Sequence, residues 1–304
     1  MSGTHQQLLD AIDNADRPIG LLAGSGKFPI HFAKKAYQLG RSLVTVGLRG
    51  EAAPALKELS SEFYWTGVAK LGRTIRCFRN AGVQHVVMAG KVQKTQMYTP
   101  WRIVRFLPDW RTIKVWFNRH RKNNSDDNLL LAVINEFAKD GIEIVSALDL
   151  CPELLVKSGT LTTRVPTVKE MADVRFGWYL AKEMGRLDVG QSVAVKESAV
   201  LAVEAIEGTD KAILRAGQLC PVGGFVVVKV AKPQQDTRFD VPTIGTDTIE
   251  TMKKAGARVL AVEDSQTILI DEAETIALAN RNAITIVSCS EQSLTEDAPL
   301  LTDR

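Results

Sequence analysis

Histidine and cysteine are scarce in this chain and widely scattered. All four histidines precede residue 121, so the rest of the chain has no imidazole to activate a serine nucleophile, and any metal there would need oxygen ligands. The four cysteines lie roughly seventy residues apart, a spacing that excludes a CxxC pair or a zinc ribbon and predicts reduced thiols. These residues are His5, His31, His85 and His120, and Cys77, Cys151, Cys220 and Cys289.

A large excess of one charge and a long apolar run are also missing. Lysine and arginine total 38 against 35 for aspartate and glutamate, and the net charge of +3 is too small to attract nucleic acid to the molecule as a whole. Met1–Asp16 has no basic-then-apolar signal pattern, and no later apolar run is as long as a membrane span. We therefore expect a cytoplasmic protein with no nucleic-acid partner.

What is present is the composition of a globular protein, with 45% hydrophobic and 24% charged residues in a chain of 304. From residue 18 to 147, short β-branched runs alternate with amphipathic segments, which predicts an α/β fold: a Rossmann-like N-terminal domain with a parallel sheet. Strands are expected at 19–23, 42–46, 62–66, 85–89 and 142–145, and helices at 28–39, 71–81 and 128–140.

The pattern changes after residue 147. Periodicity is weak from 148 to 174, where Pro152, Gly159 and Pro166 interrupt the sequence, and we expect a linker there. Residues 175–289 predict a second, mixed α/β domain that would be the catalytic one. Its strands are expected at 192–195, 199–203, 225–230, 258–262 and 267–270, and its helices at 209–218, 246–255 and 271–280. Residues 1–17 are expected to form an extension and residues 290–304 a loosely held tail.

A glycine turn follows the first expected strand. Gly24, Ser25 and Gly26 lie between strand and helix, where main-chain N–H groups and the helix dipole can hold a phosphate. Pro29 stands where a dinucleotide fingerprint has its third glycine, which disfavours a nicotinamide-dependent oxidoreductase. The other interpretation is a turn that only joins a strand to a helix.

A basic, aromatic segment extends from Lys91 to Lys122. It holds nine lysines and arginines against one acid, Asp109, together with three of the five tryptophans. Cations beside bulky aromatic rings suit a membrane surface or a phosphorylated amphiphile. The alternative is a solvated basic helix whose aromatic rings belong to the core and which Pro108 interrupts.

Two acidic loops follow strands of the second domain. Glu204, Glu207 and Asp210 lead from a strand into a helix through a Gly-Thr pair, which a merely acidic surface turn would not require. The second loop, Lys232–Gly245, crowds cations, acids and amides directly behind an apolar strand. Crowded charge costs stability, and such loops are typical of binding or catalysis.

These residue types fit the hydrolysis of a phosphoanhydride. The oxygens of the anhydride repel nucleophiles, so hydrolysis needs cations on those oxygens and a carboxylate that orients and deprotonates water. The second loop contains both, with Lys232 and Arg238 as the cations. Mg²⁺ prefers carboxylate oxygens and water, which an acidic site without histidine can offer.

With these residues in view, the chain resembles the two-domain UDP-2,3-diacylglucosamine pyrophosphatases of lipid A biosynthesis, the type unrelated to calcineurin-like metallophosphoesterases. The resemblance extends from about Pro18 to Val287 and rests on several sequence blocks in the same order. The blocks are Gly20–Gly26, Val86–Val92, Asp126–Leu130, Asp188–Gln191, Glu204–Asp210 and Lys232–Gly245.

The resemblance implies Mg²⁺-dependent hydrolysis of UDP-2,3-diacylglucosamine to UMP and 2,3-diacylglucosamine 1-phosphate by a homodimer. Asp240 would be the catalytic carboxylate, as general base or metal ligand, and Asp236 the second candidate, with Glu207 and Asp210 as further candidates for metal or substrate contacts. Substrate contacts are expected from Gly24, Ser25, Gly26, Lys91, Gln191, Thr209, Lys232, Gln235 and Arg238.

The same resemblance gives the basic, aromatic segment a purpose, because a diacylated substrate resides at a membrane. The segment could then make peripheral contact with the inner membrane surface. The alternative function is a nucleotide-sugar or lipid-phosphate binding protein that does not turn its ligand over.

Overall fold

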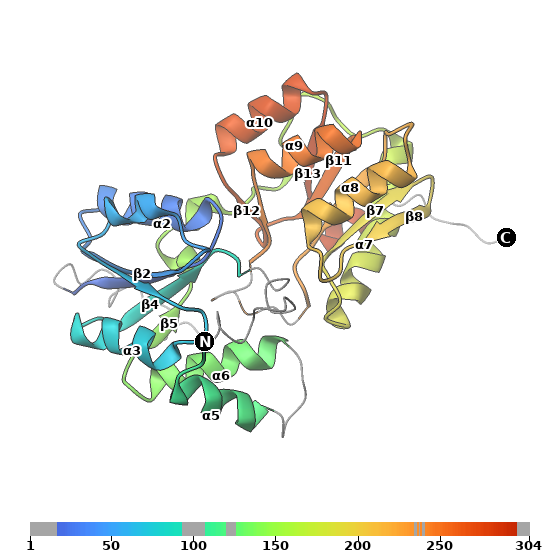
Figure 1. The fold of residues 1–304 in the computed structure, drawn as a ribbon. Coiled ribbons are helices and arrows are strands. Elements are labelled where there is room, and N and C mark those ends of the chain that lie inside the picture. The colour runs from blue at the N-terminus through green and yellow to red at the C-terminus, as the bar shows by residue number, and fades with distance from the viewer. Residues whose placement is uncertain are drawn as a thin grey trace. The chain divides into compact units, whose positions relative to one another are not determined.

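A computed structural model describes residues 17–92, 107–119, 126–233, 236, 238 and 241–296. The chain divides into two compact units, the first comprising Met1–Pro152 and Thr237–Phe239 and the second Glu153–Asp236 and Asp240–Arg304. Each unit has its own sheet (Figure 1). We describe each unit by itself.

The first unit is built on a five-stranded parallel sheet with the order β3-β2-β1-β4-β5. Its strands are β1 (Ile19–Ala23), β2 (Leu43–Leu48), β3 (Glu62–Thr66), β4 (His85–Ala89) and β5 (Glu143–Val145). Every residue of β2 is buried, as expected for an inner strand covered on both faces. The strand order reverses between β1 and β4, and in open α/β sheets ligands bind beside such a point.

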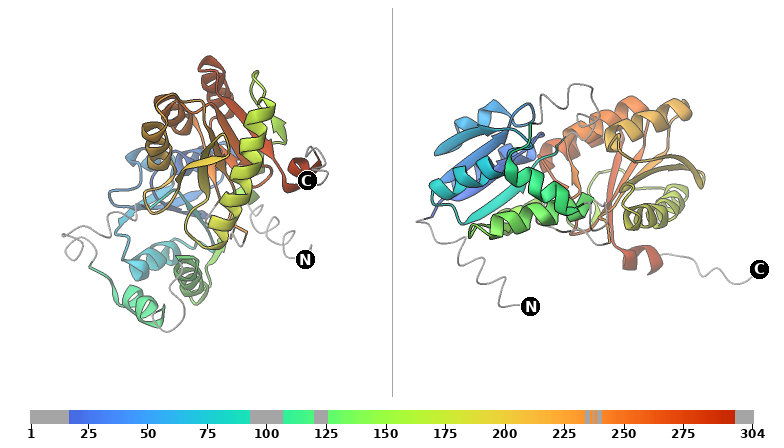
Figure 2. Two further views of the ribbon diagram at one scale, coloured as in Figure 1. Left: turned by 90° about the vertical axis from the view of Figure 1, so that its right-hand side faces the viewer. Right: turned by 60° about the horizontal axis from the view of Figure 1, so that its bottom comes forward.

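Helices cover both faces of this sheet (Figure 1). They are α2 (Phe28–Gln38), α3 (Leu71–Asn80), α5 (Trp110–Arg119) and α6 (Asp126–Ala138), with a short 3-10 turn at Pro54–Lys57. The core between the sheet and helices α3, α5 and α6 includes Phe78, Val115 and Phe137, all buried. Helix α5 packs against α6 and α3, and the right-hand view of Figure 2 shows α5 and α6 side by side.

The second unit is built on a six-stranded mixed sheet with the order β6-β13-β11-β9-β7-β8. Strands β9, β11 and β13 are parallel, whereas β7 runs antiparallel to β9, and β6 antiparallel to β13. The strands are β6 (Gly159–Thr160), β7 (Ser192–Lys196), β8 (Ala199–Val203), β9 (Val226–Lys229), β11 (Val259–Glu263) and β13 (Thr285–Cys289). A separate two-stranded sheet pairs β10 (Thr243–Ile244) with β12 (Ile268–Leu269).

The helices of the second unit divide between the two faces of its sheet. Helix α7 (Val168–Arg186) buries Val174 and Trp178 against one face. The opposite face is covered by α8 (Thr209–Leu219), α9 (Thr246–Ala255) and α10 (Glu272–Arg281). A short helix, α11 (Glu291–Glu296), follows β13.

The predicted fold class is confirmed: an α/β protein with a parallel N-terminal sheet and a second, mixed α/β unit. Helices α5, α7 and α11 and strands β6, β10 and β13 were not predicted. Helix α7 begins at Val168, inside the stretch where the sequence pattern predicted a linker. Its composition is mixed and includes Gly177 and Gly185, which weakens the apolar periodicity by which a helix is recognised. Strand β13 was left unassigned, although all its residues are buried, and α11 lies within the expected tail.

The described part of the chain has neither a membrane-spanning helix nor a disulfide. No helix there is both long and apolar enough to cross a bilayer. All four cysteines are free thiols; Cys77 is half-buried and the other three are buried.

The start of α7 is held by a capping box. The Thr167 hydroxyl accepts from the Glu170 N–H at 3.3 Å, and the Thr167 N–H donates to the Glu170 carboxylate at 2.8 Å. Arg164 donates to both Glu170 oxygens at 2.6 and 2.8 Å and to the Thr285 hydroxyl of β13 at 2.7 Å. Burial raises the pKa of Glu170, but the hydrogen bonds from Thr167 and Arg164 outweigh it and hold that pKa below its ordinary value.

Replacing Glu170 is therefore expected to destabilise the second unit. Glu170→Ala removes the cap and leaves the Arg164 guanidinium without its carboxylate, which should lower the free energy of unfolding by about 2 kcal/mol in urea denaturation at neutral pH. Because the pKa is lower in the folded state, the carboxylate stabilises above its unfolded pKa. That contribution is lost as the pH falls from about 5 through the folded pKa, so wild type and variant should converge in acid.

The matched control is Glu183→Ala on the same helix. Glu183 is 40% exposed and pairs only with Arg186 one turn away, so its loss should cost less than about 0.5 kcal/mol. Equal destabilisation by the two variants would contradict the role given to the capping box.

Candidate functional site

The glycine turn of the first unit is tied to the end of β4. The N–H groups of Gly24 and Ser25 donate to the carbonyls of Ala89 and Lys91, both at 2.8 Å, and the Lys91 N–H donates to the Ser25 carbonyl at 2.9 Å. The Ser25 hydroxyl also donates to the Lys91 carbonyl, at 2.8 Å. The structure thus brings together three of the predicted substrate contacts, Gly24, Ser25 and Lys91.

This pairing limits how the turn can bind an anion. Two of its N–H groups are already used within the protein, so they are not available for a phosphate. The exposed part of the turn is Gly26, with a φ of 101°, directly before helix α2. A ligand at this point would meet Gly26, the exposed Lys91 and the first turn of α2.

In the second unit, polar side chains gather where β8 and β9 end and β7 begins. Ser192 of β7 is paired with Lys229 of β9. On its other side, its main-chain carbonyl accepts a hydrogen bond from the Glu204 N–H at 2.8 Å. Laterally paired residues of a sheet point to the same face, so these three side chains form one row. It is the face covered by α8 and α9, because Ala194 and Val227, two positions along, belong to that core.

The row is almost completely buried. Ser192 is 3% exposed, Glu204 8% and Lys229 2%. The Thr209 hydroxyl at the start of α8 donates to Glu204 Oε1 at 3.0 Å and lies 3.4 Å from Ser192 Oγ. Lys229 Nζ donates to the Thr243 carbonyl at 2.9 Å. Burying charged groups costs free energy unless hydrogen bonds compensate, so this row is held in one arrangement.

Two acceptors beside the row have no hydrogen-bond partner among the described residues: Glu204 Oε2 and Gln191 Oε1. The main chain at Gly190, just before Gln191, lies very close to the main chain of Glu204. Only glycine fits there, because a Cβ would lie 2.1 Å from the Glu204 carbonyl oxygen. Buried polar atoms without a partner are rare in proteins, so each of these two acceptors calls for a donor from water, an ion or a ligand.

Lys232 follows β9 and is fixed from two directions. Its Nζ donates to Asp188 at 2.7 Å, and both side chains are largely buried. The preceding residue, Ala231, donates its N–H to Glu263 at 2.7 Å, and Lys182 donates to the same carboxylate at 2.6 Å. Lys232 thus leaves the sheet at a defined place with its charge partly balanced by Asp188.

The two predicted metal ligands are not assembled into a site. Both carboxylate oxygens of Glu207 already accept hydrogen bonds, one from Arg215 at 2.7 Å and the other from the Ala205 N–H at 3.2 Å. Burial raises the pKa of Glu207, but the main-chain and Arg215 hydrogen bonds outweigh it and hold that pKa below its ordinary value. Asp210 is exposed in the first turn of α8. Among the residues that the structure describes, no three His, Cys, Asp or Glu side chains gather around a possible ion position.

The loop after β9 is described only in part. Asp236 and Arg238 are half-buried. Gln235 and Asp240 lie outside the described residues, so their predicted roles stay predictions.

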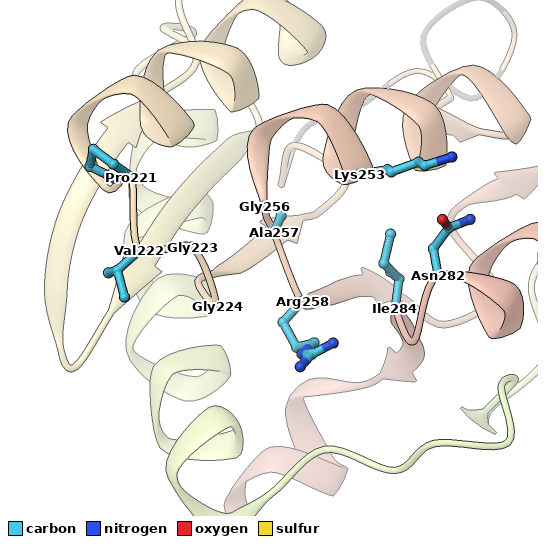
Figure 3. Close-up of a pocket in the computed structure, with 10 residues that line it drawn as sticks. All are labelled: Pro221, Val222, Gly223, Gly224, Lys253, Gly256, Ala257, Arg258, Asn282 and Ile284. Carbon is cyan, nitrogen blue, oxygen red and sulfur yellow. The ribbon is translucent and has the colours of Figure 1, made fainter.

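A cavity of about 350 Å³ lies elsewhere in the second unit (Figure 3). It is at the amino ends of β9, β11 and β13, the edge opposite the polar row, and no predicted site residue lines it. Lys253 and Arg258 line it, but the ends of α8 and α9 are also here, and their carbonyls disfavour an anion. We therefore assign it no function.

Sequence reasoning missed Ser192, Lys229 and the Lys182–Glu263 pair. One signal was present: Lys229 is the single charged residue in the expected strand 225–230. A lysine inside an apolar strand needs a polar partner and marks the end of the sheet. The Lys182–Glu263 pair had no such signal, because 81 residues separate its members.

The hydrogen bond between Thr209 and Glu204 is expected to stabilise the row. Thr209→Val keeps the shape of the side chain but leaves a buried carboxylate without its donor, which should lower the free energy of unfolding by about 1–3 kcal/mol in urea denaturation. Thr209→Ser, which keeps the hydroxyl, should be close to wild type. Thr251→Val on α9 is the control, since that hydroxyl bonds only to the Asp247 carbonyl of its own helix; an equal effect there would contradict the proposal.

Comparison with known proteins identifies the family. Residues 18–154 match the LpxI N-terminal domain and residues 157–287 the LpxI C-terminal domain. UDP-2,3-diacylglucosamine pyrophosphatase LpxI of Caulobacter vibrioides is 32% identical over 284 residues, which cover 91% of this chain and 99% of that protein.

Among solved structures, the biotin carboxylase domain of Hydrogenobacter thermophilus 2-oxoglutarate carboxylase is 13% identical, with 66% of this chain and 40% of that chain covered. Its TM-score of 0.24 is too low to support an argument. The match to both LpxI domains in order, and to nearly the full length of the Caulobacter protein, shows that this chain belongs to the LpxI family.

Proposed function

We propose that this chain hydrolyses the diphosphate of UDP-2,3-diacylglucosamine to UMP and 2,3-diacylglucosamine 1-phosphate, a step of lipid A biosynthesis. The observation that carries the proposal is the 32% identity to the Caulobacter pyrophosphatase over 99% of its length. The match includes both domains of the family.

The edge of the second sheet supports the assignment on physical grounds. Lys232 is a fixed cation there, and the amino ends of α8 and α9 begin at the same edge, where their dipoles favour negative charge. A diphosphate would interact favourably with both. The unpaired acceptors Glu204 Oε2 and Gln191 Oε1 offer positions for hydroxyl or amide donors of a nucleotide sugar.

The chemistry assigns a role to each loop residue. Asp240 would accept the proton of the attacking water, whose oxygen forms the new bond to phosphorus while the bridging P–O bond breaks. Lys232 and Arg238 would neutralise the phosphate oxygens as charge accumulates on them. Asp236 is the second candidate for the base. Thr209 and Gln235 would contact another part of the substrate.

We also propose that the reaction needs Mg²⁺. The family resemblance suggests Glu207 and Asp210 as its ligands, but the pairing of Glu207 with Arg215 does not fit that role, and we name no ligand for the ion. When bound, the ion would neutralise charge on the diphosphate. Since Glu207 is already paired with Arg215, we assign no reaction step to the ion. On the same resemblance we propose that the protein is a homodimer that works in the cytoplasm.

The first test is Asp240→Asn, which keeps the size of the side chain and removes the base. UMP release from UDP-2,3-diacylglucosamine, followed by mass spectrometry, should fall by about a hundredfold or more, with little change in substrate binding. Glu274→Gln, an exposed substitution on α10, is the matched control and should leave the rate unchanged. Full activity of the Asp240 variant would refute its role, and tight binding without any product from the wild type would favour the binding-protein alternative.

The second test concerns the metal. EDTA should abolish UMP release by the wild type, and added Mg²⁺ should restore it, because the diphosphate then loses its charge compensation. Hydrolysis that continues at an undiminished rate in EDTA would contradict the metal requirement and leave the hydrolase assignment intact.

A further inference from the structure

The outward face of α5 is aromatic. Trp110 is 77% exposed, Phe117 69% and Trp116 54%. Trp110 and Phe117 are seven positions apart and therefore lie on the same side of the helix, with the exposed Lys114 between them. We call Trp110, Lys114 and Phe117 the α5 face; Trp116 lies about 100° further round the helix, at the flank of this face. Large apolar side chains gathered on one exposed face mark an interaction site more often than single exposed ones do.

The other side of α5 is packed into the core of the first unit, and these contacts fix the rotation of the helix about its axis. Val115 is 6% exposed within the core of the first unit. The Thr112 hydroxyl donates to the Ala69 carbonyl at 2.8 Å, and Arg111 forms an ion pair with Asp140. Rotating the helix to bury its aromatic rings would break all of these contacts.

The charged residues of helix α5 itself are of one sign. Helix α5 has no acidic residue, and Asp109, just before it, is the one acid between Lys91 and Lys122. Both oxygens of Asp109 are engaged: Oδ1 accepts from the Thr112 N–H at 3.0 Å and Oδ2 from the Arg73 N–H at 3.2 Å. The exposed cation Lys114 therefore stands among aromatic rings with no carboxylate on its own helix.

We propose that the α5 face docks on an anionic lipid surface. Tryptophan rings are suited to the boundary between headgroups and acyl chains, since one edge is polar and the rest apolar. A lysine beside them is attracted to the phosphates of anionic lipids. An interfacial helix with Trp and Phe on its apolar side and cations nearby has this composition.

A second copy of the chain fits this surface less well. In a two-fold symmetric contact the same face meets itself, so each copy would bring a Lys114 into the interface. No carboxylate of α5 could compensate that charge. An anionic lipid surface, by contrast, carries a charge opposite to that of Lys114 and would attract it.

The experiment is co-sedimentation of the full-length protein with vesicles, without substrate. The wild type should bind vesicles containing phosphatidylglycerol more strongly than vesicles of phosphatidylcholine alone, and high salt should weaken the binding. Trp110→Ser with Phe117→Ser should weaken it by about tenfold, because less apolar area enters the headgroup region. Lys114→Glu should weaken binding to anionic vesicles by about fivefold.

The matched control is Tyr37→Ser with Leu39→Ser, which removes two exposed apolar side chains from another surface of the first unit and should leave vesicle binding unchanged. Equal binding by the α5 double variant, or no binding by the wild type, would overturn the proposal. So would conversion of a dimer to monomers by that variant in analytical ultracentrifugation, since the face would then be a protein interface. UMP release from substrate dissolved in detergent tests the proposed function separately and should be unchanged in the double variant.

Discussion

The burial of Lys229 at the end of β9 constrains the second unit more than any other single feature. An ammonium group that is 2% exposed must be surrounded by oxygen, and the chain meets this need with a carbonyl of β10, while Ser192 of the neighbouring strand lies beside it. The hydrogen bond from Lys229 to the Thr243 carbonyl fixes β10 and therefore the start of α9. Ser192 lies beside the Thr209 hydroxyl, which in turn donates to Glu204. The loops that enter both helices are thus positioned by one polar row and not by apolar packing alone.

Most of the fold could be predicted because apolar periodicity is a local signal. Strands such as β1 and β4 have the same bounds in the sequence prediction and in the structure. Helix α7 was harder, since its first turn is specified by hydrogen bonds among Arg164, Thr167 and Glu170 and not by a run of apolar residues. Strand β13 is short and looks like many apolar segments until its partner β11 is known.

The candidate site was less accessible to sequence reasoning, for two physical reasons. Residue types show that a group can be charged, but not whether its charge is already used: Glu207 has the chemistry of a metal ligand, yet it is paired with Arg215. Proximity across the sheet is also invisible in the sequence, so Lys182 and Glu263, which together hold the main chain before Lys232, could not be paired in advance. The sequence allowed the aromatic rings of α5 to lie either in the core or at an interaction surface. Their large exposed fractions do not support a place in the core.

The meeting of the two turns after β1 and β4 has a consequence for how this family can diversify. A Cβ on Gly24 would lie 2.6 Å from the Lys91 carbonyl oxygen, and one on Gly90 would lie 2.6 Å from that of Ser25. Main chain cannot rotate aside as a side chain can, and Gly90 also has a φ of 91°. This place in the first unit is therefore closed to side-chain variation, and any change in what it recognises during evolution has to come from residues around it.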